Sequence, residues 1–290
     1  MQETTYSAAC PSGLIVTVRE AQVRDVKQLG KAARDSRVDS LAEFLSALTV
    51  GVEDPGPYTW SGQRVISTDG KVNWSAALQG DSSAMFINAR VNAFGTDLYF
   101  KVSCANSLCR KQVERHIEIK DIVQHGLSDL AFKTVTEHGT DHQFELELPR
   151  CGVVVGWKLL TRADQHKVDR IIEDKIDEVG PASLLVRLPY IAGCGTPGER
   201  SKFVNHLVVS DSDFLRESYE EHDILLEDMV EVTCSRCGHI FETPLPTGKD
   251  FFSSRSAAPP RPSKNGRSKR STNSDTSQFL EEDTGTSEAR

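Results

Sequence analysis

Hydrophobic residues alternate with polar ones in several short runs of the chain, which is the pattern of half-buried strands. The first run covers 14–19 (LIVTVR) and follows a turn-forming Pro-Ser-Gly at 11–13. Further strands are predicted over 98–104, 113–119, 142–149, 152–160 and 229–234. The runs 142–149 and 152–160 are expected to pair as a hairpin, and 183–193 has strand character before it becomes a loop.

Apolar residues at helical spacing lie between these runs and predict four helices. The helices cover 25–50 with a break near Ser36, 81–94, 161–176 and 213–229. Side chains that accept backbone N–H bonds favour helix starts, and the expected N-caps are Asp81, Thr161, and Ser212 or Asp213. Gly95 is expected to end the second helix, and an irregular loop with two prolines covers 52–60.

This mixture of elements predicts an α+β fold. A strand, a helix and a strand–cysteine turn–strand unit follow one another in both halves of the chain. We therefore expect one domain over 1–248, made of two mixed αβ lobes, 10–125 and 140–248, that each end in a cysteine hairpin. The alternative is that two short αβ units resemble each other by chance.

The composition changes at the end of this domain. Residues 249–290 are rich in Ser, Pro and Arg and then acidic, with few apolar residues. Such a segment cannot bury enough surface to offset its ordering entropy, so a disordered tail is expected.

Four cysteines in two distant pairs carry the strongest chemical signal. Cys104 and Cys109 form one pair, and Cys234 and Cys237 form the other, each at a tight turn between strand-like runs. Two such hairpins can offer four thiolates to one structural Zn²⁺, with Gly238 suited to a left-handed turn. A metal-free pair of hairpins, disulfides and redox chemistry are the alternatives.

Charge and cysteine usage narrow the class of protein. The net charge of −8 argues against a folded body that coats nucleic acid, since such domains have a basic face. Weak nucleic-acid binding is expected only through the basic tail segment 261–270.

Seven cysteines without a dense disulfide framework fit a reduced compartment. The first residues lack the pattern of a signal peptide, and no apolar run approaches a membrane span, so a soluble protein is expected.

Other candidate chemistry is weaker. Cys194 follows no phosphate-loop pattern and has no base beside it, so a small loop residue is favoured over an activated nucleophile. His138 and His142 are four apart, but Gly139 favours a solvated turn over a helical metal pair. His116 and His239 lie near the cysteine pairs, where four thiolates already complete a site.

Three stretches, read together, resemble a known family. The first is 11–29 (PSGLIVTVREAQVRDVKQL). The second is 53–60 (EDPGPYTW) with 74–109 (from WSAALQGDSSAMF to CANSLC), and the third is 145–165 (ELELPRCGVVVGWKLLTRADQ) with the later 230–246 (VEVTCSRCGHIFETPLP). Their order and spacing over about residues 10–247 resemble the T4-type bacteriophage baseplate protein family, which comprises baseplate hub components and hub-assembly proteins of contractile tails. The turn CANSLC lacks the proline and glycine that often shape such knuckles.

The resemblance implies a non-enzymatic role in building a baseplate, with other hub and tail proteins as partners. It implies a location in the host bacterial cytoplasm during assembly, or in the baseplate of the finished virion. Asp81 and Arg90 are then candidates for a polar pair or an interface contact, against an N-cap and a solvated arginine. A zinc-ribbon adaptor that binds nucleic acid and an enzyme that uses Cys194 are the rival functions.

Overall fold

The computed structural model describes residues 4–32, 39–62, 64–119, 123–174, 179–227, 229–245 and 251–252. Helices and antiparallel sheets occur together, which confirms the predicted α+β class. Residues 1–259 cluster as one compact unit, and 260–290, the second unit, lie outside the described ranges. No helix in the described part of the chain has the length and apolarity needed to span a bilayer.

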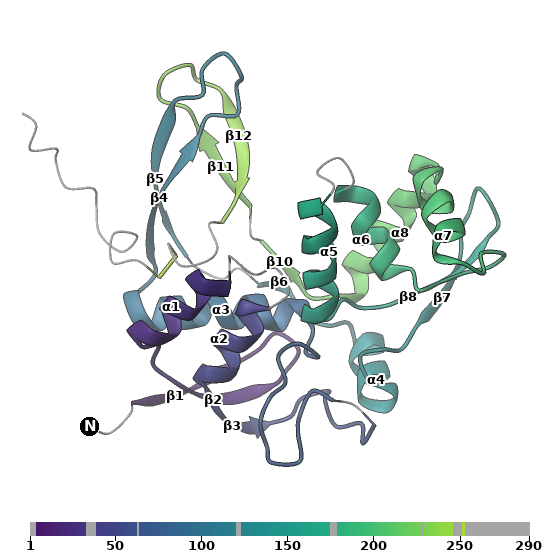
Figure 1. The fold of residues 1–290 in the computed structure, drawn as a ribbon, viewed down its shortest axis with the longest axis horizontal. Coiled ribbons are helices and arrows are strands. Elements are labelled where there is room, and N and C mark those ends of the chain that lie inside the picture. The colour runs from purple at the N-terminus through teal and green to yellow at the C-terminus, as the bar shows by residue number, and fades with distance from the viewer. Residues whose placement is uncertain are drawn as a thin grey trace, which may run out of the picture. The chain divides into compact units, whose positions relative to one another are not determined.

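The N-terminal sheet has the order β1-β2-β3 and is antiparallel throughout. Its strands are β1 (Thr5–Ala9), β2 (Ile15–Arg19) and β3 (Thr49–Asp54), and β2 confirms the predicted strand over 14–19. Helices α1 (Val23–Ala32) and α2 (Ser40–Leu48) connect β2 to β3 (Figure 1). The predicted helix to residue 50 is too long, because the β-branched run that begins at Thr49 pairs with β2 instead.

Helix α3 (Gln79–Phe94) is the central helix of the N-terminal half. Its N-cap is Leu78, so the prediction of Asp81 as N-cap is wrong, and Asp81 lies within the first turn. Gly95 ends the helix with φ +76°, as expected from a residue without a Cβ.

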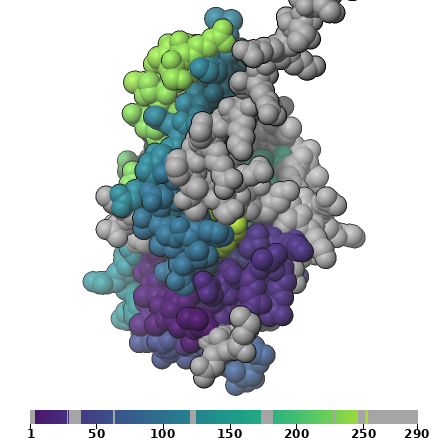
Figure 2. All heavy atoms as spheres, turned by 90° about the vertical axis from the view of Figure 1, so that its left-hand side faces the viewer, coloured from purple at the N-terminus to yellow at the C-terminus, as the bar shows by residue number. Residues whose placement is uncertain are grey.

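Two antiparallel hairpins follow from the two cysteine stretches. β4 (Asp97–Ser103) pairs with β5 (Gln112–Glu118), and β11 (Met229–Thr233) pairs with β12 (Ile240–Pro244). The hairpins lie side by side although more than a hundred residues separate them (Figures 1 and 2). The strands predicted before and after each cysteine turn are confirmed.

The middle of the chain adds two further small sheets. β6 (Val123–His125) pairs with β10 (Leu225–Leu226), and β7 (Phe144–Glu147), β8 (Val154–Trp157) and β9 (Tyr190–Ile191) form the other sheet. The β7–β8 hairpin confirms the pairing predicted for 142–149 and 152–160. Helix α4 (Asp129–His138) precedes it and ends at Gly139, where a solvated turn was expected.

Four more helices complete the described fold: α5 (Arg162–Asp174), α6 (Val179–Arg187), α7 (Pro197–Asn205) and α8 (Val209–His222). Thr161 caps α5, because its Oγ1 accepts the Asp164 N–H at 3.2 Å, as predicted. The strand character predicted for 183–193 is wrong for 183–187, because these residues belong to α6. Helix α8 begins at Val209, ahead of the caps expected at Ser212 or Asp213.

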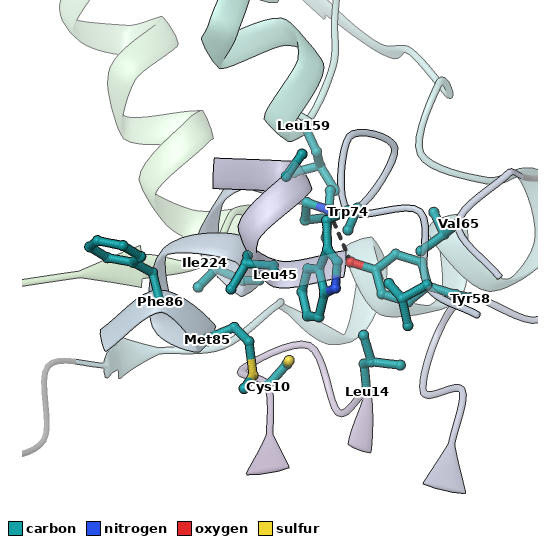
Figure 3. Packing of buried hydrophobic residues seen from close by; sticks show 14 of the residues in the cluster. Cys10, Leu14, Leu45, Tyr58, Val65, Trp74, Met85, Phe86, Leu159 and Ile224 are labelled. Atoms are coloured by element: carbon teal, nitrogen blue, oxygen red, sulfur yellow. Dashed lines mark hydrogen bonds between the residues drawn. The ribbon is translucent and has the colours of Figure 1, made fainter. Parts of the chain in front are cut away.

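Side chains from both halves of the chain form one continuous hydrophobic core. Trp74 and Tyr58 lie beside one another in it, and Cys10 lies close to Met85 (Figure 3). The core and the clustering of residues 1–259 give no division into lobes 10–125 and 140–248, so these lobes are not confirmed.

Two phenylalanines from the predicted tail belong to this core. Phe251 and Phe252 are buried, with Phe251 stacked on Phe86 and Phe252 edge-on to Phe44. They depart from the expectation that the polar tail begins at 249. The tail from 253 onward lies outside the described residues.

Candidate metal centre

The four predicted cysteines meet between the two hairpins. Cys104 directly follows β4 and Cys234 directly follows β11, while Cys109 and Cys237 lie in the turns that come next. The Sγ atoms of Cys104 and Cys237 are 3.8 Å apart, as are those of Cys109 and Cys234. All four sulfurs lie within 4.8 Å of one another, so each hairpin contributes two donors to one cluster.

These distances fit a tetrahedral metal ion. A Zn–S bond of about 2.3 Å gives an S···S edge of about 3.8 Å in a regular tetrahedron. A disulfide would need sulfurs about 2.05 Å apart, and all four cysteines are free thiols. The cluster could therefore hold one metal ion and is compatible with zinc.

The two cysteine turns share one backbone geometry despite different spacing. The Cys104 N–H donates to the Lys111 carbonyl at 2.9 Å, and the Cys234 N–H donates to the His239 carbonyl at 2.8 Å. The residue after the second cysteine has positive φ in both turns, +44° at Arg110 and +70° at Gly238. Arg110 thus takes the left-handed conformation in the first turn, where the sequence has no glycine. Gly238 takes the left-handed conformation predicted for it in the second turn.

Backbone N–H groups also act on the sulfur atoms themselves. The backbone N–H groups of Arg236 and Cys237 donate to the Cys234 sulfur and lower the pKa of that thiol to about 6. Burial raises the pKa of Cys104 to about 12, although an N–H bond from Asn106 opposes this. One thiolate is therefore favoured at neutral pH, and a cation would stabilise the remaining sulfurs as thiolates.

A small hydrophobic cluster, separate from the main core, packs against the cysteines. Val113 of β5 and Val232 of β11 are buried with Cys104 and Cys234, and Phe241 packs against them. These apolar side chains join the two hairpins beside the cysteines.

Arg90 joins helix α3 to the start of the first hairpin and to the buried Phe251. It is fully buried on α3, and its guanidinium donates to three backbone carbonyls: Phe251 at 2.9 Å, Gly95 at 2.7 Å and Asp97 at 2.7 Å. Asp97 begins β4, and Phe251 lies a few residues after β12. The solvated arginine considered from the sequence is wrong, because this side chain is buried and joins α3 to the start of β4 and to Phe251.

Asp81 is also fully buried and gathers three distant stretches. Its carboxylate accepts the Ser12 N–H at 3.0 Å and the Tyr58 hydroxyl at 2.5 Å. The Tyr58 oxygen in turn accepts the Leu78 N–H at 3.1 Å. Asp81 and Arg90 thus have different partners, and burial raises the pKa of Asp81 to about 6 even though its hydrogen bonds lower it.

Two glycines allow these stretches to approach. A Cβ built on Gly56, which has φ +54°, would lie 2.6 Å from the backbone nitrogen of Leu14. A Cβ built on Gly80 would lie 2.4 Å from the Ile224 Cβ. Each position therefore needs a residue without a side chain, and neither requirement is visible in local sequence.

The remaining candidates lie elsewhere. His138 and His142 stack with ring centroids 5.0 Å apart, and His116 bonds Asp97 through Nε2 at 2.7 Å. His239 is exposed, and Cys194 is half-buried in the turn after β9. Among the described residues, the four cysteines are the one group arranged to hold a metal ion.

The fold and the site define a mixed α+β protein with a four-cysteine cluster that joins two hairpins distant in sequence. Comparison with protein-family models, with curated proteins and with solved structures found no match.

Proposed function

We propose that this protein acts without catalysis in the assembly of a contractile-tail baseplate, as a hub component or hub-assembly protein held together by structural zinc. The proposal starts from the resemblance of 10–247 to the T4-type baseplate family. Its partners are then other hub and tail proteins, and it acts in the host bacterial cytoplasm or remains in the virion baseplate.

The convergence on Asp81 is the observation that carries the proposal. Ser12 comes from the first stretch of the resemblance and Tyr58 and Asp81 from the two parts of the second, and they share one buried hydrogen-bond network. Gly56 adds a backbone contact between two of the same stretches. Residues of the resembling stretches that share one buried hydrogen-bond network support the resemblance better than residues scattered over the surface would.

Zinc is the metal that best suits the cluster. Four thiolates at tetrahedral spacing form a closed site with no position for a substrate, which is the arrangement of structural zinc. Because the free energy of metal binding contributes to folding, zinc would fasten the hairpins of a chain whose hydrophobic fraction is only 38%.

Metal content by mass spectrometry tests the zinc site. We expect about one zinc per chain, lost in Cys104→Ser and in Cys237→Ser, because either change leaves three of four ligands. Cys151→Ser is the matched control, since Cys151 is exposed and lies outside the cluster. Absence of metal from carefully reduced protein would overturn the zinc assignment.

Copurification tests the role in assembly. The protein is coexpressed with the baseplate hub and tail proteins of the phage or prophage that carries its gene. A stable complex with one of them is expected. If none of them binds the zinc-loaded protein, the assembly role is wrong even if the metal site is present.

A further inference from the structure

The far end of the paired hairpins carries exposed side chains that the metal centre does not use. We define the hairpin tip as residues 105–111 and 235–240. Leu108 is 96% exposed and Ile240 is 58% exposed. Arg110, Lys111 and Arg236 are exposed beside them. No Asp or Glu occurs in 104–113 or 234–241, so the tip is both apolar and basic.

The tip presents these side chains on fixed backbone. Hydrogen bonds close both turns at their cysteines, and the Leu108 N–H donates to the Asn106 side-chain oxygen at 2.9 Å. Single exposed aliphatic residues are common on protein surfaces. Here Leu108 projects from a closed turn that also carries two cations, which is the composition of a small recognition surface.

Arg110 adds an independent argument. Its φ of +44° makes it the one non-glycine residue with positive φ among the described residues, and the equivalent place in the other turn is Gly238. A glycine at position 110 would adopt this positive φ without the strain that a side chain causes. Strained residues persist where the side chain has a use, and a guanidinium at the tip is such a use.

We infer that the hairpin tip docks an acidic protein segment that carries an apolar side chain, on a hub or tail protein of the assembly proposed above. The apolar side chain would cover Leu108, and its acidic neighbours would pair with Arg110 and Arg236. This inference rests on the proposed function, because that function supplies the partner.

Charge favours a protein segment over nucleic acid as the occupant. The whole chain carries −8, so a long polyanion that extends beyond the tip is repelled more than a short acidic segment is. Glu231 and Glu242 lie directly opposite each other on the β11–β12 shaft, so acidic side chains follow the basic tip on that hairpin. A patch of this size neutralises too few phosphates for strong binding, but it matches a short acidic segment.

The experiment measures the affinity of the zinc-loaded full chain for the hub or tail protein that copurifies with it. Arg110→Glu combined with Arg236→Glu, and separately Leu108→Ser, are compared with Lys133→Glu and Leu130→Ser on the exposed face of α4. We expect each tip variant to weaken binding about tenfold or more and the α4 controls to leave it unchanged. Zinc content and thermal unfolding are measured in every variant, so that loss of the fold is recognised.

Arg110→Gly keeps the turn and removes only the guanidinium, so it should weaken binding without loss of stability. A photo-crosslinker at position 108 should attach to an acidic segment of the partner. If the tip variants bind like the wild type, or the crosslink maps to a segment without acidic residues or to nucleic acid, the docking inference is wrong while the assembly role stands. If the wild type binds no hub or tail protein, both fall.

Discussion

Replacing Asp81 by asparagine should change how the stability of this protein depends on pH. Asp81 is fully buried, and its carboxylate accepts bonds from Ser12 and Tyr58. Asparagine has nearly the same shape and retains the acceptor for the Ser12 N–H, but it does not ionise. Because the oxygen that accepts the Tyr58 hydroxyl becomes an NH2 group, the substitution also changes one hydrogen bond, and the pH dependence of the stability difference is what reports the buried charge.

The magnitude follows from the pKa. Burial raises the pKa of Asp81 from 3.8 to about 6. Because the folded state binds this proton more tightly than the unfolded state, the contribution to stability is fully present below pH 3.8. It is lost as the pH rises through 6. About two pKa units correspond to ~3 kcal/mol of unfolding free energy, so the Asp81→Asn variant should gain roughly that amount on the wild type between pH 3.5 and 7.

Urea unfolding followed by tryptophan fluorescence measures this difference, since Trp74 and Trp157 are both buried. All other titrating groups are common to both proteins and cancel in the comparison. Asp164→Asn is the control of opposite sign: burial alone would raise the pKa of Asp164, but Lys158 and Lys167 lower it, so its contribution is present above pH 3.8 and lost as the pH falls. Parallel pH curves for wild type and Asp81→Asn would refute the reasoning.

Four further substitutions test backbone conformation and packing by chemical denaturation. Gly238→Ala should lower the free energy of unfolding by about 1 kcal/mol, because alanine disfavours positive φ. Arg110→Gly, at the equivalent place in the other turn, should not lower it. Equal losses in the two variants would contradict the shared turn geometry. Gly80→Ala should cost about 1–3 kcal/mol, since its Cβ would lie 2.4 Å from Ile224, and an unchanged midpoint would show that this contact yields easily. Phe252→Ala should lower the free energy of unfolding by about 3–5 kcal/mol, because Phe252 is buried in the core. A loss under about 1 kcal/mol would show that Phe252 belongs to a solvated tail.

The hairpins and their cysteines could be predicted because the signals are local. Alternation marks each strand, and the cysteine spacing marks each turn. Their juxtaposition was expected from the chemistry of thiolate ligands, and the sulfur distances now support it. The left-handed Arg110 could not be predicted, because an arginine gives no sign that its backbone will take a glycine conformation.

The misjudged parts depend on distant contacts. The apolar run in 183–187 fits a strand or a helix equally well, and packing selects α6. Phe251 and Phe252 are an isolated apolar pair within a polar stretch, so no periodicity marks them as core. Asp81 resembles a helix cap until Ser12 and Tyr58 surround it.

The cysteine cluster also fixes an order of events during synthesis, because it can be completed only once Cys237 has been made. Cys109 and Cys234 are 125 positions apart, so at about 5–20 residues per second the first pair of thiols waits roughly 6–25 seconds for the second. Until then the nascent chain carries a half-site and an unpaired hairpin. A chain that stops before residue 234 keeps both, so the completed cluster distinguishes chains that include the second hairpin turn from those that end before it.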